Sequence, residues 1–520
     1  MIVTKSGLPT NPRWRTTRPA GSFAEPDSTR RVTFSLAVIV LLGSAVWAQP
    51  PEPTLDPIMR VVDLNVGEEQ QVTLANGQTI TVKLLALDEH RDTVRDAVRQ
   101  STVSVQIGQE TASLVSALYR LPQVVGGVQI DCPITKGYCV GDSQVNPWGL
   151  AADARFRLWP ADSPLTRPGT FRYPLNQKWF ASATQSCNEP CYVDGSELPR
   201  NKRIYYHYGY DFGGAEGLVE IVSATSGLVV SSGEARLPGF DDTPIAPRYD
   251  VIYVLDQRGW YYRYSHLQSI DSAIRPGQLV RIGQRLGVLG KEGGSGGWSH
   301  LHFDITFRQP SGEWGASDAF ALCREAYMRE YQPDLIACAR PHHFALLGEK
   351  VTLDGSRSWA RARITGYDWT FTDGTTASGP IHERSYDEPG VYSEVLKISD
   401  DAGNTDYDFA IVNVLDPRQL DELPPTIHAT YAPTFDIQPG DEVTFKVRTF
   451  RTTDGHETWD FGDGTPKVEV KSDGNMVSLA KDGYAETHHK FKKSGIYVVR
   501  VERTDARGST AVGHVAVSVE

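Results

Sequence analysis

The C-terminal third of the chain contains one pattern twice, and this repetition restricts the fold more than any other feature. Each copy has a Trp followed by an Asp-Gly pair, at Trp369 and Asp373 in the first copy and at Trp459 and Asp463 in the second. A Pro-containing break at residues 421–425 separates the copies. Short strand-like runs with turn residues about every 8–12 positions are typical of β-sandwiches. We therefore predict two β-sandwich domains, at residues 336–417 and 424–520.

The rest of the chain also predicts strands. A length of 520 residues allows about three or four domains. Residues 58–164 alternate apolar and polar side chains and include a hairpin turn at Asn76-Gly77, which predicts a β-rich N-terminal domain. Residues 165–335 alternate short β-branched runs with Gly turns, which predicts an antiparallel sheet. Helical spacing is clearest at residues 317–331, with Ser317 and Asp318 as capping residues. The predicted fold class is mainly β.

The N-terminus is typical of an exported protein. Arg30 and Arg31 precede a short apolar run, and small residues lead to a cleavage position after Ala48. We interpret residues 1–48 as a signal peptide and the Pro-rich residues 49–57 as a linker. The alternative is a membrane anchor, but the apolar run is shorter than the ~20 residues that a spanning helix needs. The expected location is therefore outside a bacterial cell or in the periplasm.

Cysteine usage agrees with export. All six cysteines follow the cleavage position, and an even number in an exported chain favours disulfides. They form three near pairs in the sequence: Cys132 with Cys139, Cys187 with Cys191, and Cys323 with Cys338. A cysteine zinc site is the weaker alternative because the chain has no CxxC pair.

The formal net charge of −12 does not indicate a nucleic-acid-binding protein, which carries a basic patch.

Histidines and an aspartate in three short segments indicate a metal site. The segments are His207-Tyr-Gly-Tyr-Asp211, Tyr264-Ser-His266-Leu and His300-Leu-His302-Phe. Zinc accepts imidazole nitrogen and carboxylate oxygen, and a catalytic zinc site uses three protein ligands and leaves one position open. The two-residue spacing of His300 and His302 in a strand places both imidazoles on one face. One of them can then bind metal while the other lies beside the open position.

These segments resemble the lysostaphin/LytM-type zinc endopeptidases, metallopeptidase family 23. The family's marks are His-x-Gly-x-Asp, Tyr-x-His-Leu, a Gly-x-x-Val-x-x-Gly run (here residues 277–287) and His-Leu-His-Phe, and all occur here in the same order. The repeat in the C-terminal third, with its Trp-Asp-Phe-Gly-Asp-Gly core in the second copy, resembles the polycystic kidney disease (PKD) domain, an immunoglobulin-like β-sandwich.

The resemblance implies a division of labour within the site. His207, Asp211 and His302 would bind Zn²⁺, and His266 and His300 would be the catalytic histidines beside it. It also implies a LytM-like antiparallel sheet, the duplicated hybrid-motif type. Two neutral imidazoles and one carboxylate leave such a zinc site with a net positive charge, so that bound water can ionise near neutral pH.

The chain departs from the family at three places near the site. Trp298-Ser299 replaces the usual Gly-Pro, residues 236–249 form an insertion, and the Gly-rich residues 293–297 replace a substrate-lining turn.

The sequence patterns of other hydrolase classes fit this chain poorly. The G-x-S-x-G at residues 293–297 precedes a strand instead of opening a helix, and the chain has no H-E-x-x-H. Asp460 and Asp463 could bind calcium, although shaping a sandwich turn is the simpler interpretation.

We therefore predict a secreted zinc metalloendopeptidase that uses zinc-activated water, with the peptide cross-links of peptidoglycan as its substrate by family analogy. Two alternatives stay open: a peptidase that degrades extracellular protein, and a catalytically inactive scaffold or regulator with a peptidase fold. The resemblance to PKD domains implies that the two repeats position or bind, with carbohydrate, protein or other domains of this chain as targets. Neither a nucleic-acid partner nor a stable membrane anchor is expected.

Overall fold

The computed structural model describes residues 49–139, 146–178, 183–192, 204–420 and 422–520. Contacts divide the chain into residues 1–46 and one compact unit of residues 47–520. The expected signal peptide lies outside the described residues. Within them, no helix has the length and apolar character needed to cross a membrane. The expected linker, residues 49–57, has no regular secondary structure.

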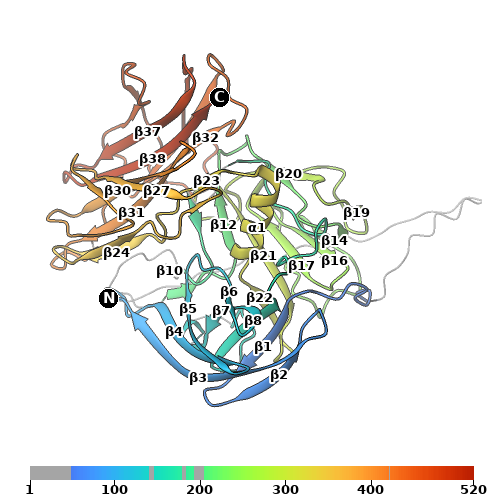
Figure 1. The fold of residues 1–520 in the computed structure, drawn as a ribbon. Helices are drawn as coiled ribbons and strands as arrows, with labels where there is room; N and C mark the ends of the chain where they lie inside the picture. Colours follow the sequence, from blue (N-terminus) through green and yellow to red (C-terminus); the bar gives the residue numbers. More distant parts are fainter. Residues whose placement is uncertain (1–48, 140–145, 179–182, 193–203, 421) are drawn as a thin grey trace, which may run out of the picture. The chain divides into compact units, whose positions relative to one another are not determined.

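Residues 58–164 form two four-stranded antiparallel sheets around a shared apolar core (Figure 1). The predicted turn at Asn76-Gly77 joins the first two strands of one sheet, and Gly77 has φ +87°, a left-handed conformation that suits glycine. That sheet has the order β2 (Glu69–Thr73), β3 (Thr79–Arg91), β4 (Val98–Ile107), β5 (Glu110–Ala117). The other has the order β1 (Arg60–Leu64), β8 (Ala154–Pro160), β7 (Val128–Thr135), β6 (Gln123–Val125), and a short 3₁₀ turn, Lys136–Tyr138, follows β7.

The next part of the chain contains a nine-stranded antiparallel sheet. Its main order is β15 (Ala235–Arg236), β14 (Gly227–Ser232), β16 (Ile252–Asp256), β17 (Tyr261–Ser265), β21 (His300–Arg308), β12 (Tyr210–Gly213), β9 (Thr184–Gln185), with β19 (Leu279–Val280) beside β14 and β22 (Trp314–Ser317) beside β21. A smaller sheet has the order β13 (Glu220–Val222), β20 (Arg285–Leu289), β18 (Leu267–Ile270), and β10 (Pro190–Tyr192) pairs with β11 (Ile204–Tyr206). These strands confirm the predicted antiparallel sheet.

The predicted helix is present but begins later than expected. It is α1 (Phe320–Tyr331), the one α-helix among the described residues. Ser317 ends strand β22, because its backbone pairs with Ile305. Asp318 does act at the helix start: its Oδ1 accepts a hydrogen bond from the Phe320 N–H at 2.8 Å. The helix packs its buried residues, including Phe320 and Tyr327, into the core of the large sheet.

The C-terminal repeats each bury their Trp, Trp369 and Trp459, in a separate β-sandwich core. The nine-stranded sheet here follows the order β24 (His343–Leu346), β31 (Thr405–Leu415), β30 (Gly390–Asp400), β38 (Thr510–Val519), β37 (Gly495–Thr504), β34 (Glu457–Asp460), β35 (Val468–Val470), with β27 (Ile364–Thr370) and β28 (Thr376–Ser378) branching from β30. The smaller sheets are β25 (Val351–Asp354) with β29 (Ile381–Arg384), and β32 (Thr426–Ala432), β33 (Val443–Phe450), β36 (Ala485–His489). The last pair is β23 (Leu335–Ile336) with β26 (Trp359–Ala360).

The acidic turn of the second repeat is held together by its own hydrogen bonds. Asp460 Oδ1 accepts from the Gly462 N–H at 3.0 Å, and Asp463 Oδ1 accepts from the Thr465 N–H at 3.0 Å. Asp463 Oδ2 lies 2.9 Å from His489 Nε2. Both aspartates therefore shape the turn, as the simpler interpretation of this motif expected.

The structure does not establish the expected disulfides. Cys132, Cys187, Cys323 and Cys338 are buried and carry no disulfide in this structure. Burial raises the pKa of each of these four thiols. The side chain of Cys191 lies outside the described residues. The three expected pairs stay a prediction.

Candidate metal centre and active site

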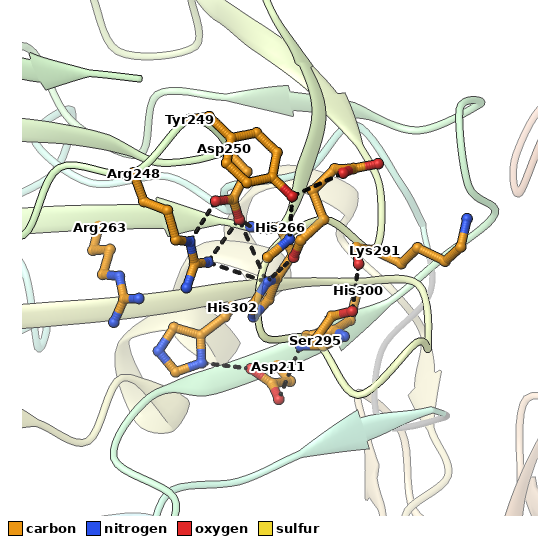
Figure 2. Close-up of polar contacts among 12 residues, drawn as sticks. Asp211, Arg248, Tyr249, Asp250, Arg263, His266, Lys291, Ser295, His300 and His302 are labelled. Carbon is orange, nitrogen blue, oxygen red and sulfur yellow. Dashed lines mark hydrogen bonds and ion pairs between the residues drawn. The ribbon is translucent and has the colours of Figure 1, made fainter. Parts of the chain in front are cut away.

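The central strand β21 and its neighbours bring four of the predicted residues together, namely Asp211, His266, His300 and His302 (Figure 2). On one side it pairs with β12, and Asp211 lies directly opposite His302 in that register. On its other side it pairs with β17, which ends at Ser265 opposite His302 and leads into His266. Opposed residues of an antiparallel pair project from the same face. The register therefore places Asp211, His302 and the end of β17 at one position on the sheet.

His207 reaches the same position from the segment between β11 and β12. Its Nδ1–H donates to the Ser186 carbonyl at 3.1 Å, which leaves Nε2 for the centre of the site. This Nε2 lies 3.2 Å from Asp211 Oδ1 and 3.0 Å from His302 Nδ1. Gly209 makes this approach possible: a Cβ at position 209 would lie 2.5 Å from His302 Cε1. The Gly of the His-x-Gly-x-Asp motif thus provides space for the His302 ring.

The donor set of this cluster fits a zinc ion. The ligand atoms of His207, Asp211 and His302 lie within 4.8 Å of one another, and all three residues are buried. Two imidazole nitrogens and one carboxylate oxygen are the ligand types of catalytic zinc sites. Burial raises the pKa of Asp211, but the imidazoles of His207, His300 and His302 lower it well below its usual range. The cluster therefore presents an ionised carboxylate to a bound cation.

The raised pKa of His302 also indicates a site that favours positive charge. Burial lowers the pKa of His302, but the neighbouring Asp211 carboxylate reverses this effect and raises the pKa to about 9. His302 Nδ1 lies 2.8 Å from Asp211 Oδ1. A buried cluster that attracts a proton this strongly is suited to hold positive charge at its centre.

A further carboxylate lies behind His302. His302 Nε2 and Asp304 Oδ2 are 3.4 Å apart, and neither atom has a closer hydrogen-bond partner among the described residues. Asp304 Oδ2 also lies 3.5 Å from the guanidinium of Arg263. Burial raises the pKa of Asp304, and His302 and Arg263 lower it overall. This is the arrangement in which a carboxylate orients a metal-binding histidine and increases its basicity.

His266 is held by two hydrogen bonds, one from its backbone and one from its ring. Its backbone has φ +68°, a left-handed conformation that is uncommon outside glycine. Asp250 Oδ2 accepts a hydrogen bond from the His266 backbone N–H at 2.9 Å, and Arg248 pairs with the same carboxylate. The His266 Nδ1–H donates to the Glu292 carbonyl at 2.6 Å, so Nε2 is the basic nitrogen. Burial lowers the pKa of His266, which keeps the ring neutral at pH 7.

His300 lies beside His266, with ring centres 4.6 Å apart. Its Nδ1–H donates to the Trp298 carbonyl at 3.0 Å, and its Nε2 lies 3.3 Å from Asp211 Oδ2. The indole of Trp298 stacks on the imidazole at 3.8 Å with an interplanar angle of 17°. Burial lowers the pKa of His300 well below its usual range, so this imidazole is also neutral. Both histidines thus offer a basic Nε2 next to the metal cluster.

All five predicted residues face one cavity with a volume of ≈ 670 Å³. Gly294, Ser295 and Gly296 also line it, as expected for the Gly-rich loop. Arg248 lines it as well, so the insertion at residues 236–249 contributes to the site. Further lining comes from the C-terminal repeats, including His428 and His514. A cavity of this size is in the range of ligand-binding sites.

Three supporting residues had no assigned role in the sequence analysis. Asp304 was within reach of sequence reasoning, because a residue two positions after His302 in a strand projects from the same face. Trp298 was noted as a departure from the family, but its stacking on His300 needed the structure. Asp250 gave no local signal: the hairpin of β16 and β17 brings it to His266.

Comparison with known families agrees with this geometry. Residues 205–312 match the model of peptidase family M23, and residues 336–414 and 428–517 match two models of the PKD domain. The chain therefore contains a peptidase family M23 domain followed by two PKD domains. The mainly β fold class is confirmed.

A curated relative is the peptidoglycan DD-endopeptidase ShyA of Vibrio cholerae serotype O1. It is 33% identical over 140 residues, which are 26% of this chain and 27% of the relative. The chain thus matches 27% of that protein's length. Among solved structures, Helicobacter pylori Csd3 is 15% identical, with a TM-score of 0.19 over 47% of this chain and 80% of Csd3. Fibronectin(III)-like modules of Clostridium thermocellum CbhA are 12% identical, with a TM-score of 0.14 over 36% of this chain and 94% of theirs. These two structural likenesses carry no argument about this chain.

The contact between Asp304 and His302 leads to a testable prediction. We expect Asp304→Asn to lower zinc affinity roughly 10- to 100-fold, because the amide no longer orients and polarises the imidazole. Competition with a chelator measures the affinity. Asp250→Asn is the matched control: it changes another buried carboxylate, which contacts His266, and should leave zinc affinity unchanged. Equal zinc affinity in Asp304→Asn and wild type would contradict the role of Asp304.

Proposed function

We propose that this chain is a zinc metalloendopeptidase that acts outside the cytoplasm, secreted or in the periplasm, and hydrolyses the peptide cross-links of peptidoglycan. One observation carries the proposal: His207, Asp211 and His302 form a buried three-ligand cluster, and two neutral histidines, His266 and His300, lie beside it in the same cavity. The peptidase family M23 match and the relative named as a peptidoglycan DD-endopeptidase support the reaction and the substrate class.

His207 Nε2, Asp211 Oδ1 and His302 Nδ1 are the atoms that would hold the zinc ion. When bound, zinc supplies Lewis-acid polarisation of the peptide carbonyl and activation of water for attack. Asp304 and the Ser186 carbonyl fix the orientation of the two imidazole ligands. These outer contacts keep the donor atoms in place when the cation binds.

His266 and His300 would move the protons. Each has its Nδ1–H directed at a backbone carbonyl, Glu292 O or Trp298 O, so that Nε2 is free to accept a proton. A neutral imidazole can take the proton of the attacking water and return it to the leaving amine. A second imidazole beside it can donate a hydrogen bond to the developing oxyanion once it is protonated. The two rings are near enough to the metal ligands for either role.

Product analysis tests the substrate class. We expect the purified, zinc-loaded protein to cleave the cross-links of isolated peptidoglycan, so that linked stem peptides become monomers. Each bond cleaved should produce one new amine. Mass spectrometry of the soluble products identifies the bond. A Gly-rich extracellular protein, digested in parallel, is the comparison substrate. New amines from the protein alone would contradict the peptidoglycan proposal and favour the protein-degrading alternative.

A further inference from the structure

The second PKD domain, residues 424–520, contacts the Gly-rich loop of the active site directly. Three of its side chains bond to the backbone of residues 296–299, next to His300. The contacts are Asn475 Nδ2 to Gly296 O (3.0 Å), Arg448 Nη1 to Gly297 O (2.6 Å), and Ser299 N–H to Tyr484 Oη (2.7 Å). Arg448 and Ser299 are fully buried, so the bonds that these two residues make are shielded from water. The domain therefore holds the segment that leads into strand β21.

Glycines on both sides make the approach possible. Gly297 has φ +89°, and a Cβ at this position would lie 2.1 Å from Asn475 Oδ1. A Cβ at Gly483 would lie 2.5 Å from Arg448 Nη2. Asp473 fixes Arg448 through two hydrogen bonds, at 2.8 and 2.6 Å. The loop and the second PKD domain are thus complementary at the level of single atoms, which explains part of the loop's glycine content.

The contact continues from Tyr484 to the imidazole of His428. Tyr484 Oη accepts the Ser299 N–H at 2.7 Å and lies within hydrogen-bond distance, 2.7 Å, of His428 Nδ1. Burial lowers the pKa of His428 to about 3, which keeps the imidazole neutral. The rings of His428 and Trp298 form a T-shaped pair, with ring centres 5.3 Å apart and an interplanar angle of 79°. His428 therefore supports both Tyr484 and Trp298.

Trp298 transmits this support to His300. Its indole stacks on the imidazole and its carbonyl accepts the His300 Nδ1–H, so Trp298 sets both the plane and the tautomer of His300. His428 also lines the ≈ 670 Å³ cavity that contains the five active-site residues. A continuous series of contacts thus runs from Tyr484 and His428 through Trp298 to His300.

We propose that the second PKD domain is part of the active site, with Tyr484 and His428 as positioning residues that hold Trp298 and thereby orient His300. The proposal rests on the proposed function for its catalytic consequence. On this basis the domain is required for the rate of hydrolysis itself, in addition to any polymer that it binds. Its effect falls on kcat, because Tyr484 and His428 act on a histidine that works in the chemical step and not on the metal ligands.

Substitutions at Tyr484 and His428 test the proposal. Tyr484→Phe keeps the ring but leaves the Ser299 N–H without its acceptor, and His428→Ala removes the support of both Tyr484 and Trp298. We expect each to lower kcat about tenfold, with KM and zinc content unchanged. His428→Asn places an amide group, which can donate or accept a hydrogen bond, near the position of Nδ1 and should recover part of the rate. His488→Ala changes a half-exposed histidine of the same domain and should behave as wild type.

Hydrogen exchange of the peptide that spans residues 293–300 gives a readout that does not depend on activity. Exchange should be faster in Tyr484→Phe than in wild type, because the Ser299 amide loses its partner. Wild-type kcat in both Tyr484→Phe and His428→Ala would overturn the proposal, as would an unchanged exchange rate. If the wild type cleaves neither substrate, the proposed function fails, and the exchange measurement alone decides whether the domain holds the loop.

Discussion

Replacing His302 with Ala should empty the metal centre and abolish hydrolysis. His302 Nδ1 lies within 3.0 Å of both other ligand atoms, so its loss leaves His207 and Asp211 as a two-ligand site. Zinc affinity should fall by more than the roughly 10- to 100-fold expected for losing a residue behind a ligand. Metal analysis of the purified protein measures the stoichiometry, and release of new amines from peptidoglycan measures the activity.

The control for this experiment is His90→Ala, which removes an exposed histidine of the N-terminal domain. It should retain one zinc per chain and wild-type activity. A wild-type protein without stoichiometric zinc would refute the metal assignment. So would a His302→Ala protein that keeps both its zinc and its activity.

Replacing His266 or His300 with Ala should have the opposite signature, with zinc retained and catalysis lost. Neither side chain belongs to the three-ligand cluster, but both place a basic Nε2 beside it. Loss of a general acid–base residue lowers rates about 10²- to 10⁴-fold. We therefore expect kcat to fall by this factor in each variant, while the zinc content matches that of wild type.

The double variant separates an enzyme from an inactive scaffold. If the wild type and His266→Ala/His300→Ala give the same product profile on peptidoglycan and on protein, the chain is a scaffold with a peptidase fold. Loss of zinc in either single variant would instead move that histidine into the metal cluster.

Sequence reasoning reached the metal cluster because local rules determine much of it. The alternation of a strand places His300 and His302 on one face, and the resemblance to metallopeptidase family 23 placed His207 and Asp211 with them. Helix α1 was predicted from its periodicity; it begins at Phe320, and of the two expected capping residues only Asp318 bonds to its first turn. Pairing with strand β21 extended β22 to Ser317, and this tertiary preference overrode the local one.

The supporting contacts could not be read in this way. Asp250 reaches His266 only through the pairing of β16 with β17, and the Glu292 carbonyl reaches the same ring from a separate loop. Tyr484 lies 185 residues after Ser299, and no local pattern links them. Such contacts depend on how whole domains pack, and one sequence contains no direct signal of that packing.

Strand β21 carries the proposed ligand His302, the proposed catalytic residue His300 and the carboxylate of Asp304 within five residues, and it is hydrogen-bonded to a neighbour on each side. These three groups therefore belong to one cooperative unit of the fold. On heating, the metal should be released in the same thermal transition that unfolds this strand. No partly unfolded state should retain zinc while His300 is displaced from its position. For this centre, metal retention is thus a direct gauge of whether the middle of the sheet is intact.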